Sequence, residues 1–372
     1  MALSNFNPDD LLQGWSEEKY SPLHSEKTFA QCIREAFNIP SSDDYVYRAQ
    51  GETTLDITQR AIAGKRAHNL HGWYHDDEGK PIEPQYPTTE EITAYTTLFD
   101  PSINLPKALN GYKSNSKAHT IRSQVSNHLH ARFHNTTTGL LPSKKPRHHT
   151  NPYFTLWTYS CHELEWAGPL PSTTHTKISH HILPVFYHHF GCIVPSYAAL
   201  STIAKLAQPL KPSKDPVLPI LDIGSGNGYW TFMLRQFPVS DISQGAKPLD
   251  VRAVDNQLSE YRVTWIPDTI NVDGKAYLEK HVNGGRGCVL LLVYPQATGD
   301  FTAGVLRAFK GDTIVVAGTQ NGNGFTGFRD QGVDEWVEGH LKAFELVVRM
   351  PLPSFAGKDE ALFVFRRKVG GE

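Results

Sequence analysis

The strongest constraint on the fold is a regular alternation in the second half of the chain. Short apolar segments of four to six residues are separated by stretches with helical character: 218–223, 249–254, 269–272, 288–293, 313–317, 346–350 and 361–366. Fully apolar strands that alternate with helices predict a parallel sheet covered on both faces. We therefore predict a doubly wound α/β domain with a mostly parallel seven-stranded sheet. Its last two strands are joined without a helix, so the C-terminal strand should run antiparallel.

The first half of the chain lacks this alternation. It contains short helical patterns, such as residues 26–37 and 117–134, which proline-rich turns interrupt. We predict that residues 1–175 form an accessory region, mainly helical and irregular, which is a candidate for substrate recognition. Residues 176–372 are predicted to form the α/β domain. A chain of 372 residues suits two domains of ordinary size.

Cysteine usage and hydropathy predict the compartment. Cys32, Cys161, Cys192 and Cys288 are far apart and form no framework of short spacings, which is typical of free thiols in a reducing compartment. The first residues show neither a basic segment nor an apolar segment of the secretory type. The longest apolar runs are too short to cross a bilayer. We expect a cytoplasmic protein that does not enter the membrane, with the nucleus as an alternative. The sequence does not predict an oligomeric state.

A glycine-rich segment joins the first predicted strand of the α/β domain to its first helix. Residues 221–229 read Leu-Asp-Ile-Gly-Ser-Gly-Asn-Gly-Tyr. Glycines let the backbone approach a ligand closely, and the helix N-terminus supplies N–H groups without helical partners. A dinucleotide fingerprint would place its third glycine at position 229, where this chain has Tyr229. The pattern is therefore D-x-G-x-G-x-G.

This pattern resembles the first motif of the class I S-adenosylmethionine-dependent methyltransferase superfamily, and the resemblance covers roughly residues 190–372. It implies that Asp222 helps to hold the amino end of the methionine moiety. It also implies that Gly224, Gly226 and Gly228 pass under the cofactor. A carboxylate close to the ligand suits the ammonium and sulfonium charges of S-adenosylmethionine. The expected cofactor is S-adenosyl-L-methionine and the expected enzyme is a methyltransferase.

Two further acidic positions follow predicted strands. Asp255 ends the second strand, and the resemblance implies that it accepts hydrogen bonds from both ribose hydroxyls. Asp273 and Gly274 follow the third strand, where the family often has an acidic residue that accepts from the adenine amine. A turn formed by Asp-Gly is the alternative at this second position.

Catalytic candidates are weak. The segment 293–296, Val-Tyr-Pro-Gln, follows the fourth strand, where family members that methylate base amines carry an Asn/Asp/Ser-Pro-Pro-aromatic motif. The polar first residue and the second proline are absent, although Tyr294 could stack on a planar acceptor. His340 is the candidate general base, by similarity to small-molecule O-methyltransferases. Direct transfer to an already nucleophilic acceptor needs no such base.

Histidines cluster just before the α/β domain. Four of them lie in residues 179–189, close to Cys192. No zinc-type spacing is met, so we predict no metal site. The alternatives for these imidazoles are packing and the lining of an acceptor pocket.

Charge is distributed in two blocks. Residues 1–100 carry 17 Asp and Glu against 8 Lys and Arg, whereas residues 101–162 carry 8 Lys and Arg and no acidic residue. Either the two blocks neutralise each other, or the basic block docks nucleic acid, with Tyr153, Phe154 and Trp157 stacking on unpaired bases. Lys144, Lys145 and Arg147 of this block are predicted to lie in a loop, where their replacement should not disturb the core. We expect the methyl acceptor, which the sequence does not identify, to be a small molecule or a protein. An RNA or DNA methyltransferase and a catalytically idle scaffold are the alternatives.

Overall fold

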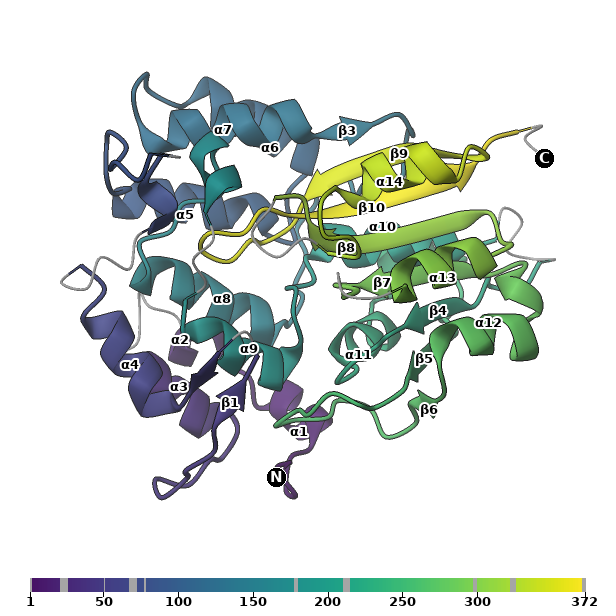
Figure 1. Cartoon of the computed structure of the whole chain (residues 1–372), viewed down its shortest axis with the longest axis horizontal. Helices are drawn as coiled ribbons and strands as arrows, with labels where there is room; N and C mark the ends of the chain where they lie inside the picture. Colours follow the sequence, from purple (N-terminus) through teal and green to yellow (C-terminus); the bar gives the residue numbers. More distant parts are fainter. Residues whose placement is uncertain are drawn as a thin grey trace.

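The computed structural model describes residues 2–20, 26–49, 51–66, 72–76, 78–176, 180–209, 215–296, 300–321 and 326–369. These residues form a mixed α/β fold, in which a large sheet lies beside a mainly helical N-terminal region (Figure 1). The prediction of an α/β fold with a mostly parallel sheet is confirmed. No helix of the described part is long and apolar enough to span a bilayer.

The large sheet has eight strands among the described residues, in the order β3-β9-β10-β8-β7-β4-β5-β6. These strands are β3 (His134–Asn135), β4 (Ile220–Ile223), β5 (Val251–Asp255), β6 (Ile270–Asn271), β7 (Val289–Val293), β8 (Thr313–Thr319), β9 (Phe344–Pro351) and β10 (Glu360–Arg367). β4 to β8 pair in parallel. β10 runs antiparallel to both β8 and β9, as predicted.

The sheet gains its eighth strand from the N-terminal half. β3 pairs antiparallel with β9, with His134 opposite Arg349 and Asn135 opposite Val348. The predicted count of seven strands is therefore one too low. A two-residue strand has no alternation of its own, so its pairing depends on the neighbouring edge.

Alternate strand residues belong to two separate buried clusters, one on each face of the sheet. In β4, Ile220 belongs to the cluster that contains α10 and α11, whereas Leu221 and Ile223 belong to the one that contains α12, α13 and α14. These helices are α10 (Tyr197–Ala207), α11 (Tyr229–Arg235), α12 (Gly274–His281), α13 (Phe301–Ala308) and α14 (Val333–His340). Burial on both faces explains why the strands are apolar throughout.

The described part of the N-terminal region is mainly helical, with one small hairpin besides the edge strand β3. Its helices are α1 (Pro8–Gln13), α2 (Glu17–Tyr20), α3 (Phe29–Ala36), α4 (Leu55–Ala63), α5 (Thr89–Thr96), α6 (Leu105–Ser114), α7 (Ile121–Arg132), α8 (Pro152–Glu163) and α9 (Ile182–Phe190). The hairpin pairs β1 (Tyr47–Arg48) with β2 (Glu52–Thr53). Side-chain caps set several helix starts: Thr120 caps α7 and Asn151 caps α8.

The N-terminal region and one face of the sheet share a single buried cluster. The connection between β9 and β10, drawn in yellow, extends among the N-terminal helices (Figure 1). There the carbonyl of Ser354 accepts from the indoles of Trp157, at 3.1 Å, and Trp166, at 2.8 Å. A domain boundary at residue 176 stays a prediction. The shared buried cluster contains residues from both sides of this position.

Candidate functional site

The parallel strands end at one edge of the sheet, and the glycine-rich loop lies there. β4 sits between β5 and β7. The chain leaves β4 towards β5 on one side and later returns to β7 on the other. Open α/β sheets bind ligands beyond the carboxyl ends of strands, at such a reversal of strand order.

The loop of residues 224–228 has a backbone that requires glycine. Gly224, Gly226 and Gly228 have φ values of +77°, +59° and +82°, in the left-handed region that L side chains rarely adopt. A Cβ on Gly226 would lie 2.8 Å from Oη of Tyr261, and one on Gly228 would overlap Ile266. The side chains of Tyr261 and Ile266 therefore pack closely against the loop, while residues 224–226 stay partly exposed.

Asp222 lies beneath this loop as a fully buried carboxylate. Its Oδ2 accepts from Oγ1 of Thr231 at 2.7 Å, whereas Oδ1 has no hydrogen-bond partner. The pKa of Asp222 is raised to about 7, mainly by burial, against the lowering effect of the hydrogen bond from Thr231 and with a smaller raising effect of the nearby Asp255. A buried carboxylate with one unsatisfied oxygen is costly unless a ligand completes it.

Two more buried polar atoms of the same segment have no protein partner. They are Oγ of Ser225 and Nδ2 of Asn227, while Oδ1 of Asn227 accepts from the N–H of Tyr229 at 3.2 Å. Together with Oδ1 of Asp222, three buried polar atoms within six residues therefore lack a hydrogen-bond partner in the protein. Buried polar groups in native proteins are nearly always satisfied. This concentration points to a polar ligand at the loop.

Asp255, at the end of β5, is brought directly to the loop. Its Oδ2 accepts from the N–H of Gly226 at 3.0 Å, and its Oδ1 accepts from the N–H of Gln257 at 2.6 Å. The side chain is partly exposed. Each carboxylate oxygen can accept more than one hydrogen bond, so Asp255 keeps capacity for a ligand while it fixes the loop.

Asp273 and Gly274 have clear structural roles. Asp273 is the N-cap of α12, and its exposed carboxylate accepts from the N–H of Ala276 at 2.9 Å. A Cβ on Gly274 would overlap Ile223 and lie 3.4 Å from the ring of Phe301. Gly274 thus allows α12 to start close against β4. These contacts match the turn alternative, and the adenine-binding role of Asp273 stays a prediction.

The two catalytic candidates lie at opposite edges of the sheet. Tyr294 follows β7 at the carboxyl edge, half-buried, with φ of +46° and its N–H donating to Ala317. His340 ends α14, just before β9 begins at the other edge. Its Nδ1 donates to the carbonyl of Trp336 at 2.9 Å, and its ring stacks on that indole. The structure therefore does not bring His340 to the glycine-rich loop.

Three side chains near the carboxyl edge of the parallel strands were not predicted as site residues: Cys192, Lys358 and Glu360. Lys358 and Glu360 are buried, and Oε1 of Glu360 has no partner. Burial raises the pKa of Glu360 to about 8, against the lowering effect of Lys358. Burial raises the pKa of the Cys192 thiol to about 12. The only sequence signal was a run of charges, 358–360, directly before an apolar strand, and such a run usually indicates solvent.

The four histidines of residues 179–189 have two kinds of surroundings. His188 and His189 are buried and hold the β1–β2 hairpin: Nδ1 of His188 lies 2.8 Å from Oη of Tyr45, and Nε2 of His189 lies 3.1 Å from Oη of Tyr47. His180 and His181, by contrast, line a hollow described below. In the described part of the chain, no group of three or more His, Cys, Asp or Glu side chains could hold a metal ion.

Comparison with known proteins places this chain in no family. No protein-family model matches the chain, and no curated protein matches it.

Proposed function

We propose that this chain is an S-adenosylmethionine-dependent methyltransferase. The observation that carries the proposal is the unpartnered Oδ1 of Asp222, buried beneath a three-glycine loop where the strand order reverses. An ammonium group is the ligand chemistry that satisfies such an oxygen best. The surroundings of the motif at residues 222–228 therefore suit S-adenosylmethionine, the cofactor that the motif implies.

The other loop atoms fit the same ligand. Oγ of Ser225 and Nδ2 of Asn227 offer donors for a carboxylate, and S-adenosylmethionine carries a carboxylate beside its ammonium group. Asp255 ends the neighbouring strand and would accept from the ribose hydroxyls. The ring of Phe301 lies 3.5 Å from a Cβ placed on Gly224, a position from which an aromatic ring could pack on the adenosine part.

We assign the finer fold on the same basis. β4 to β10 would form the seven-stranded, Rossmann-like core of a methyltransferase, with antiparallel β10 inserted between β8 and β9. β3 would be an addition from the N-terminal region.

The chemistry we propose is a direct displacement. A nucleophilic atom of the acceptor forms a bond to the methyl carbon, the carbon–sulfur bond breaks, and its electron pair stays on sulfur. S-adenosylhomocysteine and the methylated acceptor result, and the acceptor releases any displaced proton. The protein contributes by binding both reactants in line and excluding water, which can supply up to about 7–11 kcal/mol of the barrier reduction.

The structure weakens the nucleic-acid alternative in one respect. Tyr153 and Trp157, which were predicted together with Phe154 to stack on unpaired bases, are completely buried, so the prediction is wrong for these two, whereas Phe154 is partly buried. Lys145 and Arg147 both lie near Asp241, at 3.1 and 3.8 Å. We therefore favour a small molecule or a protein as acceptor. A scaffold without activity is the remaining alternative.

Two measurements test the function. Isothermal titration calorimetry of the full chain should show binding of S-adenosylmethionine and S-adenosylhomocysteine and no binding of NAD(H). A labelled-methyl assay against total RNA, DNA, protein and small-molecule extracts should then show transfer to one fraction. Binding of NAD alone would sink the cofactor assignment. Cofactor binding without transfer to any fraction would favour the scaffold.

A further inference from the structure

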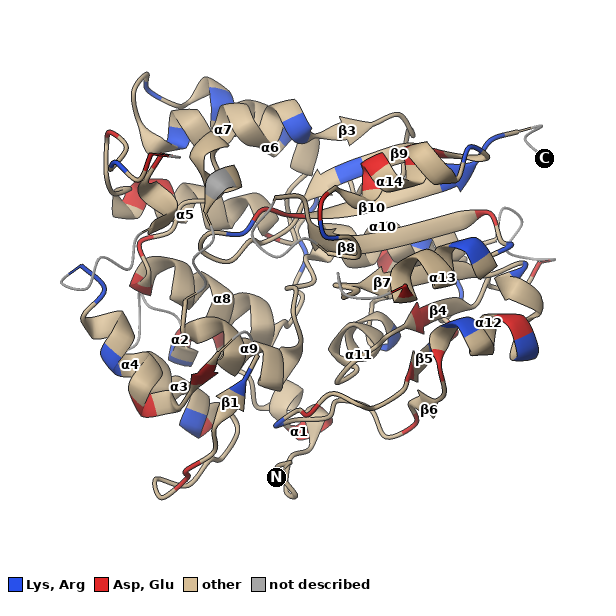
Figure 2. Ribbon diagram, in the orientation of Figure 1, with Lys and Arg blue, Asp and Glu red and all other residues tan. Residues whose placement is uncertain are grey.

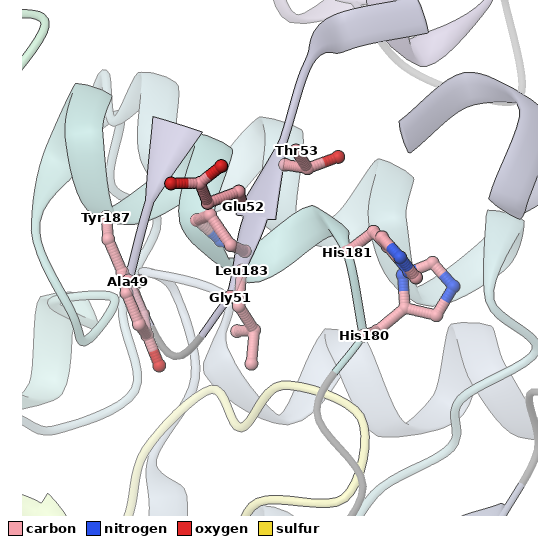
Figure 3. A pocket seen from close by; sticks show the side chains of 9 residues that line it. Ala49, Gly51, Glu52, Thr53, His180, His181, Leu183 and Tyr187 are labelled. Atoms are coloured by element: carbon pink, nitrogen blue, oxygen red, sulfur yellow. The ribbon is translucent and has the colours of Figure 1, made fainter. Parts of the chain in front are cut away.

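A hollow with a cavity volume of about 120 Å³ lies between the β1–β2 hairpin and the start of α9 (Figure 3). The described residues that line it are Ala49, Gly51, Glu52, Thr53, His180, His181, Leu183, Pro184 and Tyr187. That volume is below the roughly 300–1,000 Å³ of most sites for small organic molecules and close to the roughly 150 Å³ of a cavity that holds benzene, so the hollow suits a molecule with a single ring.

Helix α9 connects this hollow to the glycine-rich loop. Leu183, Pro184 and Tyr187 line the hollow from its first two turns. The helix ends at Gly191, where an added Cβ would lie 3.5 Å from Oδ1 of Asn227 in the loop. At a rise of 1.5 Å per residue, Tyr187 stands about 6 Å along the axis from Gly191. The inner end of the hollow is thus within reach of a molecule with a single ring.

Tyr187 forms the boundary between the hollow and the carboxyl edge. Its ring centroid lies 6.3 Å from that of Tyr294, the residue that ends β7. Its hydroxyl also interacts electrostatically with Cys192 and Glu360. A ligand in the hollow that passes Tyr187 would therefore meet Tyr294 and the loop on the other side.

The opposite wall is held in place before any ligand arrives. The hairpin is fixed to α9 through His188, whose Nε2 lies 2.6 Å from the carbonyl oxygen of Arg48, and through the contacts of Tyr45 and Tyr47 with the two imidazoles. Since binding that orders a loop costs affinity, a wall fixed in this way favours a specific small ligand.

The lining is mainly apolar. Ala49, Leu183 and Pro184 provide apolar surface, and the carboxylate of Glu52 forms an ion pair with the guanidinium of Arg48 at 2.9 Å. Among the described lining residues there is no Lys or Arg. Nδ1 of His180 accepts from the N–H of Ile182, so the neutral ring carries its proton on Nε2. Such a lining suits a planar ring with hydrogen-bonding substituents.

We propose that this hollow binds the methyl acceptor, and that the acceptor is a small planar molecule, neutral or weakly basic, of the phenol or aromatic-amine class. This inference rests on the proposed methyltransferase function. It narrows the acceptor from the two favoured classes, small molecules and proteins, to small molecules. It also excludes a nucleic acid from this hollow.

The test fills the hollow without disturbing the loop. A Cβ on Gly51 meets nothing within 4 Å, and the backbone there is not left-handed, so Gly51→Trp should fold with its indole at a residue that lines the hollow. Gly339→Trp is the matched control, because Gly339 is equally open and lies in α14. The probes are 4-ethylaniline, 4-ethylphenol and 4-hydroxyphenylacetate, which share one ring and represent an aromatic amine, a neutral phenol and an anion. Their dissociation constants are measured in the presence of S-adenosylhomocysteine.

We expect 4-ethylaniline and 4-ethylphenol to bind the wild type and Gly339→Trp, and to bind Gly51→Trp about tenfold or more weakly. The anionic probe should bind the wild type about tenfold or more weakly than 4-ethylphenol. Labelled methyl transfer to the small-molecule fraction of an extract should fall in Gly51→Trp only. Equal probe binding or equal transfer in the two variants, binding of none of the probes, or preference for the anion would overturn the proposal. Calorimetry with S-adenosylhomocysteine alone, unaffected by either variant, reports separately on the cofactor assignment.

Discussion

The hydroxyl of Thr231 donates to Oδ2 of Asp222 at 2.7 Å, and the other oxygen of this buried carboxylate has no partner. Thr231 lies one turn into α11 and Asp222 lies in β4, so the bond ties the two elements that flank the glycine-rich loop (Figure 1). An unsatisfied buried acceptor costs about 1–3 kcal/mol. Oδ1 of Asp222 is therefore able to accept a hydrogen bond from a ligand.

Asp222→Asn should weaken S-adenosylhomocysteine binding about tenfold or more, because a charge-assisted hydrogen bond contributes about 1.5–3 kcal/mol. It should also stabilise the protein above pH 7. The pKa of Asp222 is raised from 3.8 to about 7 in the fold, so its stabilising contribution is complete below pH 3.8 and is lost as the pH rises through 7. Thermal unfolding at pH 6 and pH 9 checks this expectation. The same difference between variant and wild type at both pH values would contradict it.

Thr231→Val provides a matched control for the charge. The variant keeps the side-chain shape and removes the hydrogen bond that lowers the pKa of Asp222. Cofactor affinity in the wild type should increase as the pH rises through 7, since a ligand ammonium group favours the ionised carboxylate. In Thr231→Val that increase should move to higher pH. Calorimetry across pH 6 to 9 measures the shift.

Gly226→Ala should abolish tight cofactor binding for two separable reasons. The residue has φ of +59°, and its new Cβ would lie 2.8 Å from Oη of Tyr261. Tyr261→Phe removes the hydroxyl and leaves the ring, so the double variant should recover part of the affinity, limited by the backbone strain of about 1–2 kcal/mol. Dissociation constants for the four proteins of this cycle give the answer. If the double variant binds no better than Gly226→Ala, the steric explanation is wrong.

Asp255→Ala should reduce affinity for S-adenosylhomocysteine about tenfold or more, through lost ribose contacts and through release of the Gly226 and Gln257 amides. Asp255→Asn retains one acceptor oxygen, so it should lose less. Circular dichroism verifies that both variants fold. An unchanged dissociation constant in a folded Asp255→Ala would remove this residue from the site.

Much of the α/β half could be predicted from local pattern, because burial on both faces makes each strand apolar. Segment 288–293 corresponds to β7 in this way. The meeting of Asp222 and Asp255 follows from the adjacency of β4 and β5. Lys358 and Glu360 could not be found, since charge predicts exposure, whereas the packing of their connection among N-terminal helices buries them. That packing depends on long-range contacts that no local pattern contains.

Acid should destabilise the protein through its buried imidazoles. Burial lowers the pKa of His149 to about 4 and also lowers the pKa values of His188 and His189. In the unfolded chain these rings bind protons near pH 6.5, so stability is complete above that pH and decreases as the pH falls towards 4. Each ring contributes a slope of up to about 1.4 kcal/mol per pH unit. His189→Phe keeps an aromatic ring and should reduce the slope of the unfolding free energy between pH 6.5 and 5. An identical slope would exclude His189 as a contributor.

The basic block of residues 101–162 gives the last prediction. Its recorded ion pairs go to acids of the C-terminal half: Arg132 to Asp359, and Lys145 and Arg147 to Asp241. The expectation that the acidic first hundred residues neutralise it therefore finds no support among these pairs. Figure 2 colours Lys and Arg residues on the ribbons of α6 and α7 and acidic residues on α5, and the backbone N–H of Arg122 in α7 donates to Oε1 of Glu91 in α5 at 2.9 Å. Because opposite charges intermingle here, we expect no strong field for nucleic acid.

The choice of variants for this test follows from burial. Lys144, Lys145 and Arg147 lie in a loop, as expected, but the side chain of Arg147 is only 3% exposed and donates to the carbonyl of Pro101 at 3.1 Å. Its guanidinium also lies 5.0 Å from the ring centroid of Tyr197. Replacing Arg147 would therefore disturb packing, contrary to the sequence-based expectation of a harmless surface change.

The informative variant changes three exposed lysines of the block together: Lys107→Gln, Lys113→Gln and Lys117→Gln. Labelled single-stranded RNA and DNA are titrated at low and moderate salt against wild type and variant. We expect no saturable binding by either protein, because Arg132, Lys145 and Arg147 of the block are paired with acids of the chain itself. If these lysines did contact phosphates, each would add about 0.7 to the slope of log affinity against log salt on a single strand, and the triple change would lower that slope by about 2. Such a loss of slope would restore the nucleic-acid alternative and would leave the hollow beside Tyr187 without its assigned acceptor class.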